Sequence, residues 1–132
     1  IQFINNTFFC SIQYNAGMFY IKNVSIKSNQ LKIINNVFVS TNSIYEFIDG
    51  GFFHNGNLYD TSSIIHKDTN ITISSNEYLG NPLFSNISSN GYTIASNSPV
   101  IDKGVDVGYT KDYIGNIIPY NSKYDIGAIE YR

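Results

Sequence analysis

The chain has 132 residues, of which 42% are hydrophobic, 15% aromatic and 14% charged, and its formal net charge is −2. This balance argues against nucleic acid as a partner, because nucleic-acid-binding proteins carry a basic surface. A single Cys excludes an internal disulfide framework, and no segment approaches the roughly 20 apolar residues of a membrane span. Helix formers are few while Ile, Phe and Tyr are common, so the composition predicts an all-β fold.

Short apolar runs separated by Asn, Ser and Gly predict a series of short strands. The expected strands lie at residues 2–4, 6–9, 18–21, 24–27, 31–34, 37–39, 44–48, 64–65, 71–74, 83–84 and 92–94. Between them, residues 49–63 are interpreted as an excursion from the regular path. The turn signals Asp49-Gly50-Gly51 and Asn55-Gly56-Asn57 support that interpretation.

One segment of the chain recurs. Residues 4–9 (INNTFF) return thirty residues later as residues 34–39 (INNVFV), and residues 73–78 form a looser copy. Alternate residues of a strand share a face, so Ile4 and Phe8 would point the same way, with an Asn between them. An isolated buried amide is costly, whereas equivalent amides on stacked strands can bond to one another.

The pattern therefore predicts a structural stack of Asn6, Asn36 and Asn76 inside a parallel β-helix. Chance matches in a chain rich in Asn and Ile are the alternative.

The last third carries four motifs in a fixed order. They are NPLF at residues 81–84, SPVIDKG at 98–104, DYIGN at 112–116 and DIGAIE at 125–130. Their order and spacing resemble the C-terminal region of secreted right-handed parallel β-helix repeat proteins, of the choice-of-anchor Q domain type. Val100, Lys103 and Ile114 depart mildly from the pattern of that family.

The resemblance implies a right-handed parallel β-helix of about three to four coils with a loop-rich C-terminal cap. Coils are expected over residues 1–79, and the last coil with the closing region over residues 80–132, in one structural domain. Because the chain begins at Ile1 without a Met, it is expected to be a fragment of a longer chain, with upstream β-helix coils as its partners.

Proteins similar to this family include β-helical polysaccharide lyases, hydrolases and surface adhesins. The implied function is that of a secreted or cell-surface prokaryotic protein that binds or acts on polysaccharide, with catalytic residues upstream of this fragment. The alternative is an adhesin-like or structural surface protein without catalysis. No catalytic residue is assigned here, because the chain has no Gly-x-Ser-x-Gly elbow and no Cys–His motif.

An aromatic-rich segment holds the best candidates for contact with a sugar. Asp49, His54, Tyr59 and Asp60 combine rings that could stack on a sugar with groups that could bond its hydroxyls, on an expected loop. The alternative is a surface loop whose rings pack on the body of the protein.

Asp102 and Asp106 are candidate ligands for calcium, the one cofactor that the chain suggests. Carboxylate oxygens suit that ion, but the loop lacks the alternating acids of an EF-hand. Asp in a Gly-containing turn usually accepts backbone N–H groups, so a turn role is favoured for both residues.

Overall fold

The computed structural model of the chain describes residues 1–10, 18–21, 30–41, 44–48, 52–61, 65–66, 72–86 and 92–132. Within these residues it contains twelve short β-strands and no helix. None of the described residues forms a helix that is long and apolar enough to cross a membrane. The all-β character expected from the composition is present, since β-branched and aromatic side chains fill the strands.

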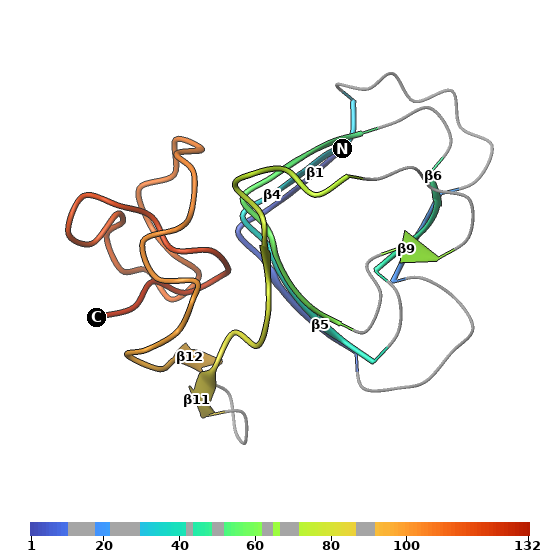
Figure 1. The fold of residues 1–132 in the computed structure, drawn as a ribbon. Helices are drawn as coiled ribbons and strands as arrows, with labels where there is room; N and C mark the ends of the chain where they lie inside the picture. The colour runs from blue at the N-terminus through green and yellow to red at the C-terminus, as the bar shows by residue number, and fades with distance from the viewer. Residues whose placement is uncertain are drawn as a thin grey trace.

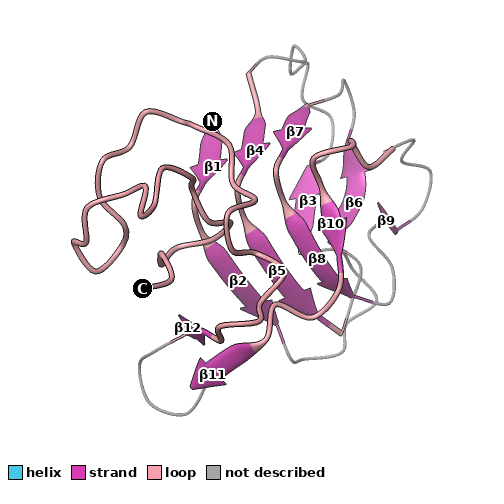
Figure 2. Cartoon of the chain, turned by 60° about the vertical axis from the view of Figure 1, so that its left-hand side comes forward, coloured by secondary structure: helices cyan, strands magenta, loops and turns pink. Residues whose placement is uncertain are grey.

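Most of the strands run parallel and lie in three small sheets (Figures 1 and 2). The first sheet has the order β1 (Gln2–Ile4), β4 (Lys32–Ile34) and β7 (Phe53–Asn55). The second has the order β10 (Tyr78–Leu79), β8 (Leu58–Thr61), β5 (Val37–Ser40) and β2 (Thr7–Cys10). The third has the order β3 (Phe19–Ile21), β6 (Tyr45–Ile48) and β9 (Ile65–His66). A separate antiparallel pair joins β11 (Phe84–Asn86) to β12 (Thr93–Ile94).

A sharp corner links each strand of the first sheet to a strand of the second. The three corner residues, here called the corner row, are Asn5, Asn35 and Gly56, with φ values of 53°, 54° and 63°. Asn and Gly are the residues that adopt this left-handed conformation most readily. A Cβ at Gly56 would lie 2.6 Å from the Asn35 Oδ1 atom, so the left-handed conformation favours glycine there and the lack of space for a side chain requires it.

The corner corrects the expectation that Ile4 and Phe8 share a face. It interrupts strand alternation, and the inward residue before it is Phe3 rather than Ile4. Phe8, Phe38 and Tyr59 then stack across three strands, with ring centroids 5.2 and 5.4 Å apart and planes within 6° and 7° of parallel. The buried members of this inner cluster are Leu31, Ile33, Phe38, Ile44, Tyr45 and Tyr59.

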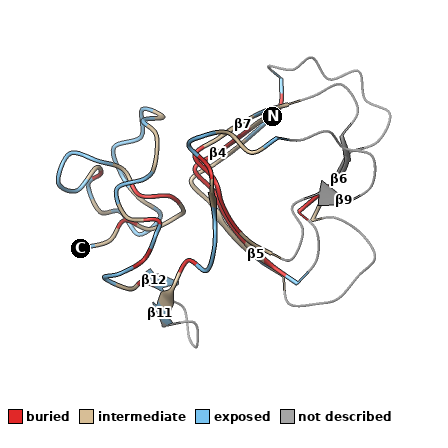
Figure 3. Ribbon diagram, in the orientation of Figure 1, coloured by how far each residue is buried: buried red, intermediate tan, exposed pale blue. Residues whose placement is uncertain are grey.

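The other face of the second sheet is covered by the C-terminal segment, residues 92–132, here called the closing segment (Figures 1 and 3). Val37 and Leu58 pack there against Val100 and Ile126, which form an outer cluster. Because β5 is buried on both faces, its first three residues are all apolar and do not alternate between apolar and polar. Asn35 fastens the closing segment to the corner through two hydrogen bonds with the backbone of Val105.

The predicted right-handed parallel β-helix of about three to four coils with a loop-rich cap is wrong for this chain. The described strands belong to separate small sheets, one of them antiparallel, and no continuous coil is evident among them. Each strand has only two to four residues, so backbone ladders are short. Side-chain bonds next to the corners add to the connection between neighbouring strands.

Two finer expectations also fail. The excursion expected near residues 49–63 contains β7 and β8, which are regular members of the first two sheets. The last coil expected after residue 80 is instead the antiparallel β11–β12 pair followed by an irregular segment with isolated bridges. The strand expected at residues 24–27 lies outside the described residues.

Candidate functional site

A row of side-chain amides, here called the amide ladder, follows the corners and consists of Asn6, Asn36 and Asn57. The Oδ1 atom of Asn36 accepts from the backbone N and the Nδ2 of Asn6, at 3.0 and 3.1 Å. The Oδ1 atom of Asn57 accepts from the same two groups of Asn36, at 2.9 and 3.1 Å. The structure thus brings together two members of the predicted stack, but Asn57 is the third member and Asn76 is exposed.

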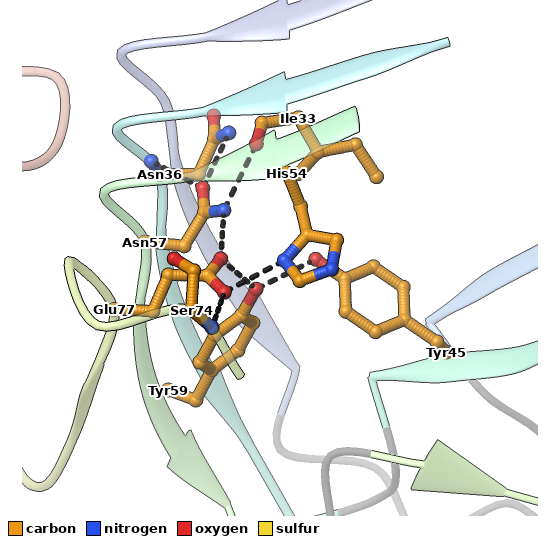
Figure 4. Close-up of polar contacts among 8 residues, drawn as sticks. All are labelled: Ile33, Asn36, Tyr45, His54, Asn57, Tyr59, Ser74 and Glu77. Carbon is orange, nitrogen blue, oxygen red and sulfur yellow. Dashed lines mark hydrogen bonds and ion pairs between the residues drawn. The ribbon is translucent and has the colours of Figure 1, made fainter. Parts of the chain in front are cut away.

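Glu77 ends the amide ladder. Because β10 pairs with β8, Glu77 lies beside Asn57 on the neighbouring strand segment. Its Oε1 atom accepts hydrogen bonds from the Asn57 Nδ2 at 2.6 Å and the Tyr59 hydroxyl at 2.7 Å. Its Oε2 atom accepts from the backbone N of Ser74 at 3.0 Å and lies 2.6 Å from the Nδ1 of His54 (Figure 4).

Burial shapes the titration of this cluster. The Glu77 side chain is 0% exposed and that of His54 is 15% exposed. Burial by itself would raise the pKa of Glu77, but hydrogen bonds from His54, Asn57, Ser74 and Tyr59 hold that pKa below its ordinary value. Burial also raises the pKa values of Tyr45 and Tyr59, whose hydroxyl oxygens lie 3.0 Å apart. Glu77 is therefore a charged carboxylate among neutral hydroxyl groups.

Chemically, the Glu77 carboxylate is fully paired, although the Oγ atom of Ser74 beside it is buried without a hydrogen-bond partner among the described residues. A carboxylate against Nδ1 orients an imidazole, as in sites where His holds or transfers a proton. Here, however, each Glu77 oxygen already has two partners within the protein. The arrangement compensates the buried charge and closes the amide ladder, which is a structural task.

The three described residues among the four expected to contact a sugar do not form one surface. His54 and Tyr59 meet at Glu77 in the interior. Asp60 follows Tyr59 on β8 and pairs in register with Val39, which packs against the outer cluster, so it faces away from Tyr59. Asp49 lies outside the described residues.

The candidate calcium ligands lie in turns of the closing segment. Asp106 accepts a bond from the backbone N of Gly108 at 2.8 Å, and Asp102 has a left-handed φ of 57°. Among the described residues, no group of three or more His, Cys, Asp or Glu side chains is placed to hold a metal ion.

A cavity of about 180 Å³ lies between the closing segment and the first corner. Its polar and aromatic lining includes Asn5, Tyr109, Lys111, Asp112, Tyr113 and Glu130. The Oδ1 atom of Asn5 is buried and has no hydrogen-bond partner within the described part of the chain. Tyr109 and Tyr113 are 47% and 84% exposed, so the lining combines exposed aromatic side chains with buried carboxylates.

Three carboxylates of the cavity lining are fixed by backbone N–H groups. Asp112 accepts from Asn116 at 2.8 Å, Asp125 from Tyr131 at 2.6 Å, and Glu130 from Tyr120 at 2.7 Å. Burial raises the pKa values of Asp125 and Glu130. These backbone bonds hold the three carboxylates in place in the cavity wall.

No protein-family model, curated protein or solved structure matches this chain. The resemblance to choice-of-anchor Q domain proteins therefore stays a prediction. The cavity and the Glu77 cluster must be interpreted from their own geometry.

Asn57, Glu77 and the cavity were not predicted from the sequence. Asn57 follows Gly56, and a Gly-Asn pair was interpreted as a simple turn although it takes the corner conformation of Asn35-Asn36. Treating Gly as equivalent to Asn at a left-handed position would have found it. Glu77 has a different side chain from the ladder asparagines, and no sequence signal marks it as their continuation.

Proposed function

We propose that this chain is a glycan-binding module of a secreted or cell-surface protein, and that it binds without catalysing a reaction. The observation that carries the proposal is the cavity beside Asn5, with its exposed tyrosines and buried polar lining. Ligand sites are concave and combine apolar or aromatic walls with a few fixed polar groups.

The size and shape of the site support a small sugar ligand. The volume of about 180 Å³ is below the roughly 300–1,000 Å³ of pockets for drug-sized molecules, so it suits one sugar residue of a longer glycan. Tyr109 and Tyr113 can present ring faces to the apolar side of a sugar, with their hydroxyls in water. Lys111 can donate to a sugar hydroxyl, and Asp112 can accept from one.

The same geometry argues for binding alone. A glycosidase uses two carboxyl groups that can exchange protons with the substrate. The lining carboxylates Asp112, Asp125 and Glu130 instead accept bonds from backbone N–H groups, and Glu77 is closed off inside the amide ladder. Their bonds give these acids a positioning role.

The test is a two-dimensional NMR titration of the chain with methyl glycosides of a neutral hexose, an N-acetylhexosamine and a hexuronate. Binding of at least one should shift the backbone signals of Tyr113, Gly127 and Ala128 at the cavity. Tyr113→Ala should weaken it about threefold to tenfold, the value of one aromatic contact. Tyr120→Ala is the control, because Tyr120 is a tyrosine of the same segment, 44% exposed against 84% for Tyr113, and does not line the cavity.

Two results would contradict the proposal. One is that no sugar shifts the cavity signals, which would favour a purely structural surface protein. The other is that Tyr120→Ala weakens binding as much as Tyr113→Ala, which would place the contact elsewhere on the closing segment.

A further inference from the structure

The strands β1 and β2 are the outermost strands of their sheets, and their free side is here called the open edge. On its inner side, β2 pairs with β5, and the carbonyl oxygen of Asn6 accepts from the backbone N of Val37 at 2.9 Å. Alternate residues of a parallel strand bond to opposite neighbours, so the backbone N–H and C=O groups of Thr7 and Phe9 point toward the open edge. No strand among the described residues pairs with them there.

The side chains at the open edge are less covered than their equivalents one strand further in. Asn36 and Phe38 are 0% exposed, whereas Asn6 and Phe8 are only half-buried. The ring of Phe8 stacks on that of Phe38, with centroids 5.2 Å apart. Among the described residues no second ring stacks on Phe8, so the aromatic column is open at this end.

The amide ladder has a direction, and its first oxygen lacks a donor. At each step the Oδ1 atom of one Asn accepts from the backbone N and the Nδ2 of the Asn before it, Asn57 from Asn36 and Asn36 from Asn6. The described residues make no hydrogen bond to the Oδ1 of Asn6, and this atom, unlike the Asn5 Oδ1, is not buried. Its Nδ2 already donates to Ile4 and Asn36. The open edge therefore presents an acceptor that requires a donor.

The rest of the ladder argues against a second copy of this chain as the occupant. The far end of the ladder is the Glu77 carboxylate, an acceptor whose oxygens each have two partners. Head-to-tail stacking would place that negative group against the Asn6 oxygen. Two open edges placed together would bring two Asn6 amides face to face, although the Nδ2 of each is already used. The occupant must bring a side-chain donor of its own.

We propose that the open edge binds an extended segment of a separate polypeptide, which adds as a further parallel strand with an Asn level with Asn6. That Asn donates its backbone N–H and its Nδ2 to the Asn6 Oδ1, and an aromatic side chain two residues later stacks on Phe8. Strand addition of this kind takes its affinity from main-chain bonds and its specificity from alternate side chains.

The described strands specify the sequence of the segment. At each corner, Asn or Gly is followed by a ladder Asn, one further residue and an aromatic residue. The three instances are Asn5-Asn6-Thr7-Phe8, Asn35-Asn36-Val37-Phe38 and Gly56-Asn57-Leu58-Tyr59. The partner is therefore a polypeptide that carries this pattern between apolar residues, and its binding does not depend on the proposed glycan site.

The probe is a synthetic peptide with the sequence of residues 31–41, LKIINNVFVST, blocked at both ends and extended by a lysine tail for solubility. It contains the complete pattern. Titrated into the intact, isotope-labelled chain, it should shift the backbone NMR signals of Thr7 and Phe9 at the open edge. The signal of Gly108 in the closing segment should stay unchanged.

A variant peptide tests the donor. Asn36→Asp in the peptide keeps the shape of the side chain but removes the Nδ2 donor and sets a carboxylate against the Asn6 oxygen. It should bind about tenfold more weakly, the value of one hydrogen bond to a solvent-shielded acceptor. Because the chain itself is unchanged, this comparison does not depend on the folding of a variant.

A pair of chain variants tests the main-chain bonds. Phe9→Pro removes an N–H that points to the open edge, a position at which edge strands accept proline. Phe9→Ala is the matched control, because it removes the same 45% exposed ring and keeps the N–H. The probe should bind Phe9→Pro about tenfold more weakly than Phe9→Ala, with unchanged signals of the closing segment showing that both variants are folded.

Each contrary result would overturn a stated part of the proposal. Absence of shifts at the open edge would overturn it as a whole. Equal binding of the two peptides would exclude the Asn6 Oδ1 as the recognition group, and equal binding by the two Phe9 variants would exclude strand addition. Edge signals that shift with chain concentration alone, with a dimer mass in sedimentation equilibrium, would assign the edge to a second copy instead.

Discussion

The amide ladder and the corner row run side by side across the same strands. The last residue of the ladder and the first residue of the corner row differ in their hydrogen bonds. The ladder ends at Glu77, where each carboxylate oxygen has two hydrogen-bond partners. The corner row ends at Asn5, where a buried oxygen has no partner among the described residues. The Glu77 carboxylate is therefore fully paired, although the Oγ atom of Ser74 beside it is, like the Asn5 Oδ1, buried without a partner among the described residues.

The difference shows how similar side chains can have separate roles. A buried polar group with all its bonds made within the protein contributes order and specifies the packing around it. A buried polar group with an unmet bond instead carries a cost that the packing around it must offset. We therefore assign a stabilising role to the Glu77 carboxylate, and the following predictions compare it with an acid of the closing segment and with the corner at Gly56.

The largest effect is expected for Glu77→Ala. This substitution leaves the buried donor groups of Asn57 and Tyr59 without an acceptor, and it removes the carboxylate that contacts His54. Each buried donor left without an acceptor costs about 1–3 kcal/mol, so the two together cost about 2–6 kcal/mol. The free energy of unfolding, measured by urea denaturation, should fall by that amount.

Glu130→Ala is the matched control for that experiment. Glu130 is also buried, but the groups that bond to it are backbone N–H groups, those of Tyr120 and Asp125. Its loss should cost about 1–2 kcal/mol. If the two variants lost equal stability, Glu77 would not have the special place in the ladder that we assign to it.

A smaller effect is expected for Gly56→Ala. The new Cβ would collide with the Asn35 Oδ1 at 2.6 Å, and φ at this position is +63°. Strain of this kind costs about 1–3 kcal/mol, and displacement of Asn35 would also disturb its contact with Val105. Urea denaturation measures the loss.

Gly108→Ala separates the two causes. Gly108 has a φ of +79°, and the position that an added Cβ would take has no neighbour within 4 Å among the described residues. It therefore reports the backbone strain without the collision. Gly56→Ala should be clearly the more destabilising of the two. Equal losses would show that the contact between the corner row and the closing segment adds little stability.

Local features of this fold could be predicted from the sequence, and its assembly could not. Apolar runs indicated the approximate positions of β1, β4, β5 and β6, because strand propensity and turn residues act locally. The thirty-residue spacing of residues 4–9 and 34–39 equals the observed register of β1 with β4 and β2 with β5. The next pair of strands, β5 and β8, has a different spacing along the sequence, because Val37 pairs with Leu58. No repeated sequence segment marks that pairing.

The candidate site was less accessible to prediction. Asn6 and Asn36 were identifiable because the same segment recurs. Glu77 was not, because a carboxylate replaces an amide there and its partners come from several parts of the chain. The cavity at Asn5 forms only when the closing segment packs against the corner, with more than one hundred residues between Asn5 and Glu130.

The smallest effects on stability are expected from a fall in pH. Their sign should be opposite for Glu77 and for the two buried carboxylates of the closing segment, Asp125 and Glu130. The pKa of Glu77 is lowered from 4.5, so its contribution to stability is present above that pH and is lost as pH falls through the folded-state value. The pKa values of Asp125 and Glu130 are raised, so protonation of these two favours the folded state as pH falls. We expect Glu77→Gln to reduce the acid-induced loss of stability, and Glu130→Gln to increase it. Urea denaturation between about pH 3 and pH 7 measures both slopes, and changes of the same sign in the two variants would contradict the opposite pKa shifts of Glu77 and Glu130.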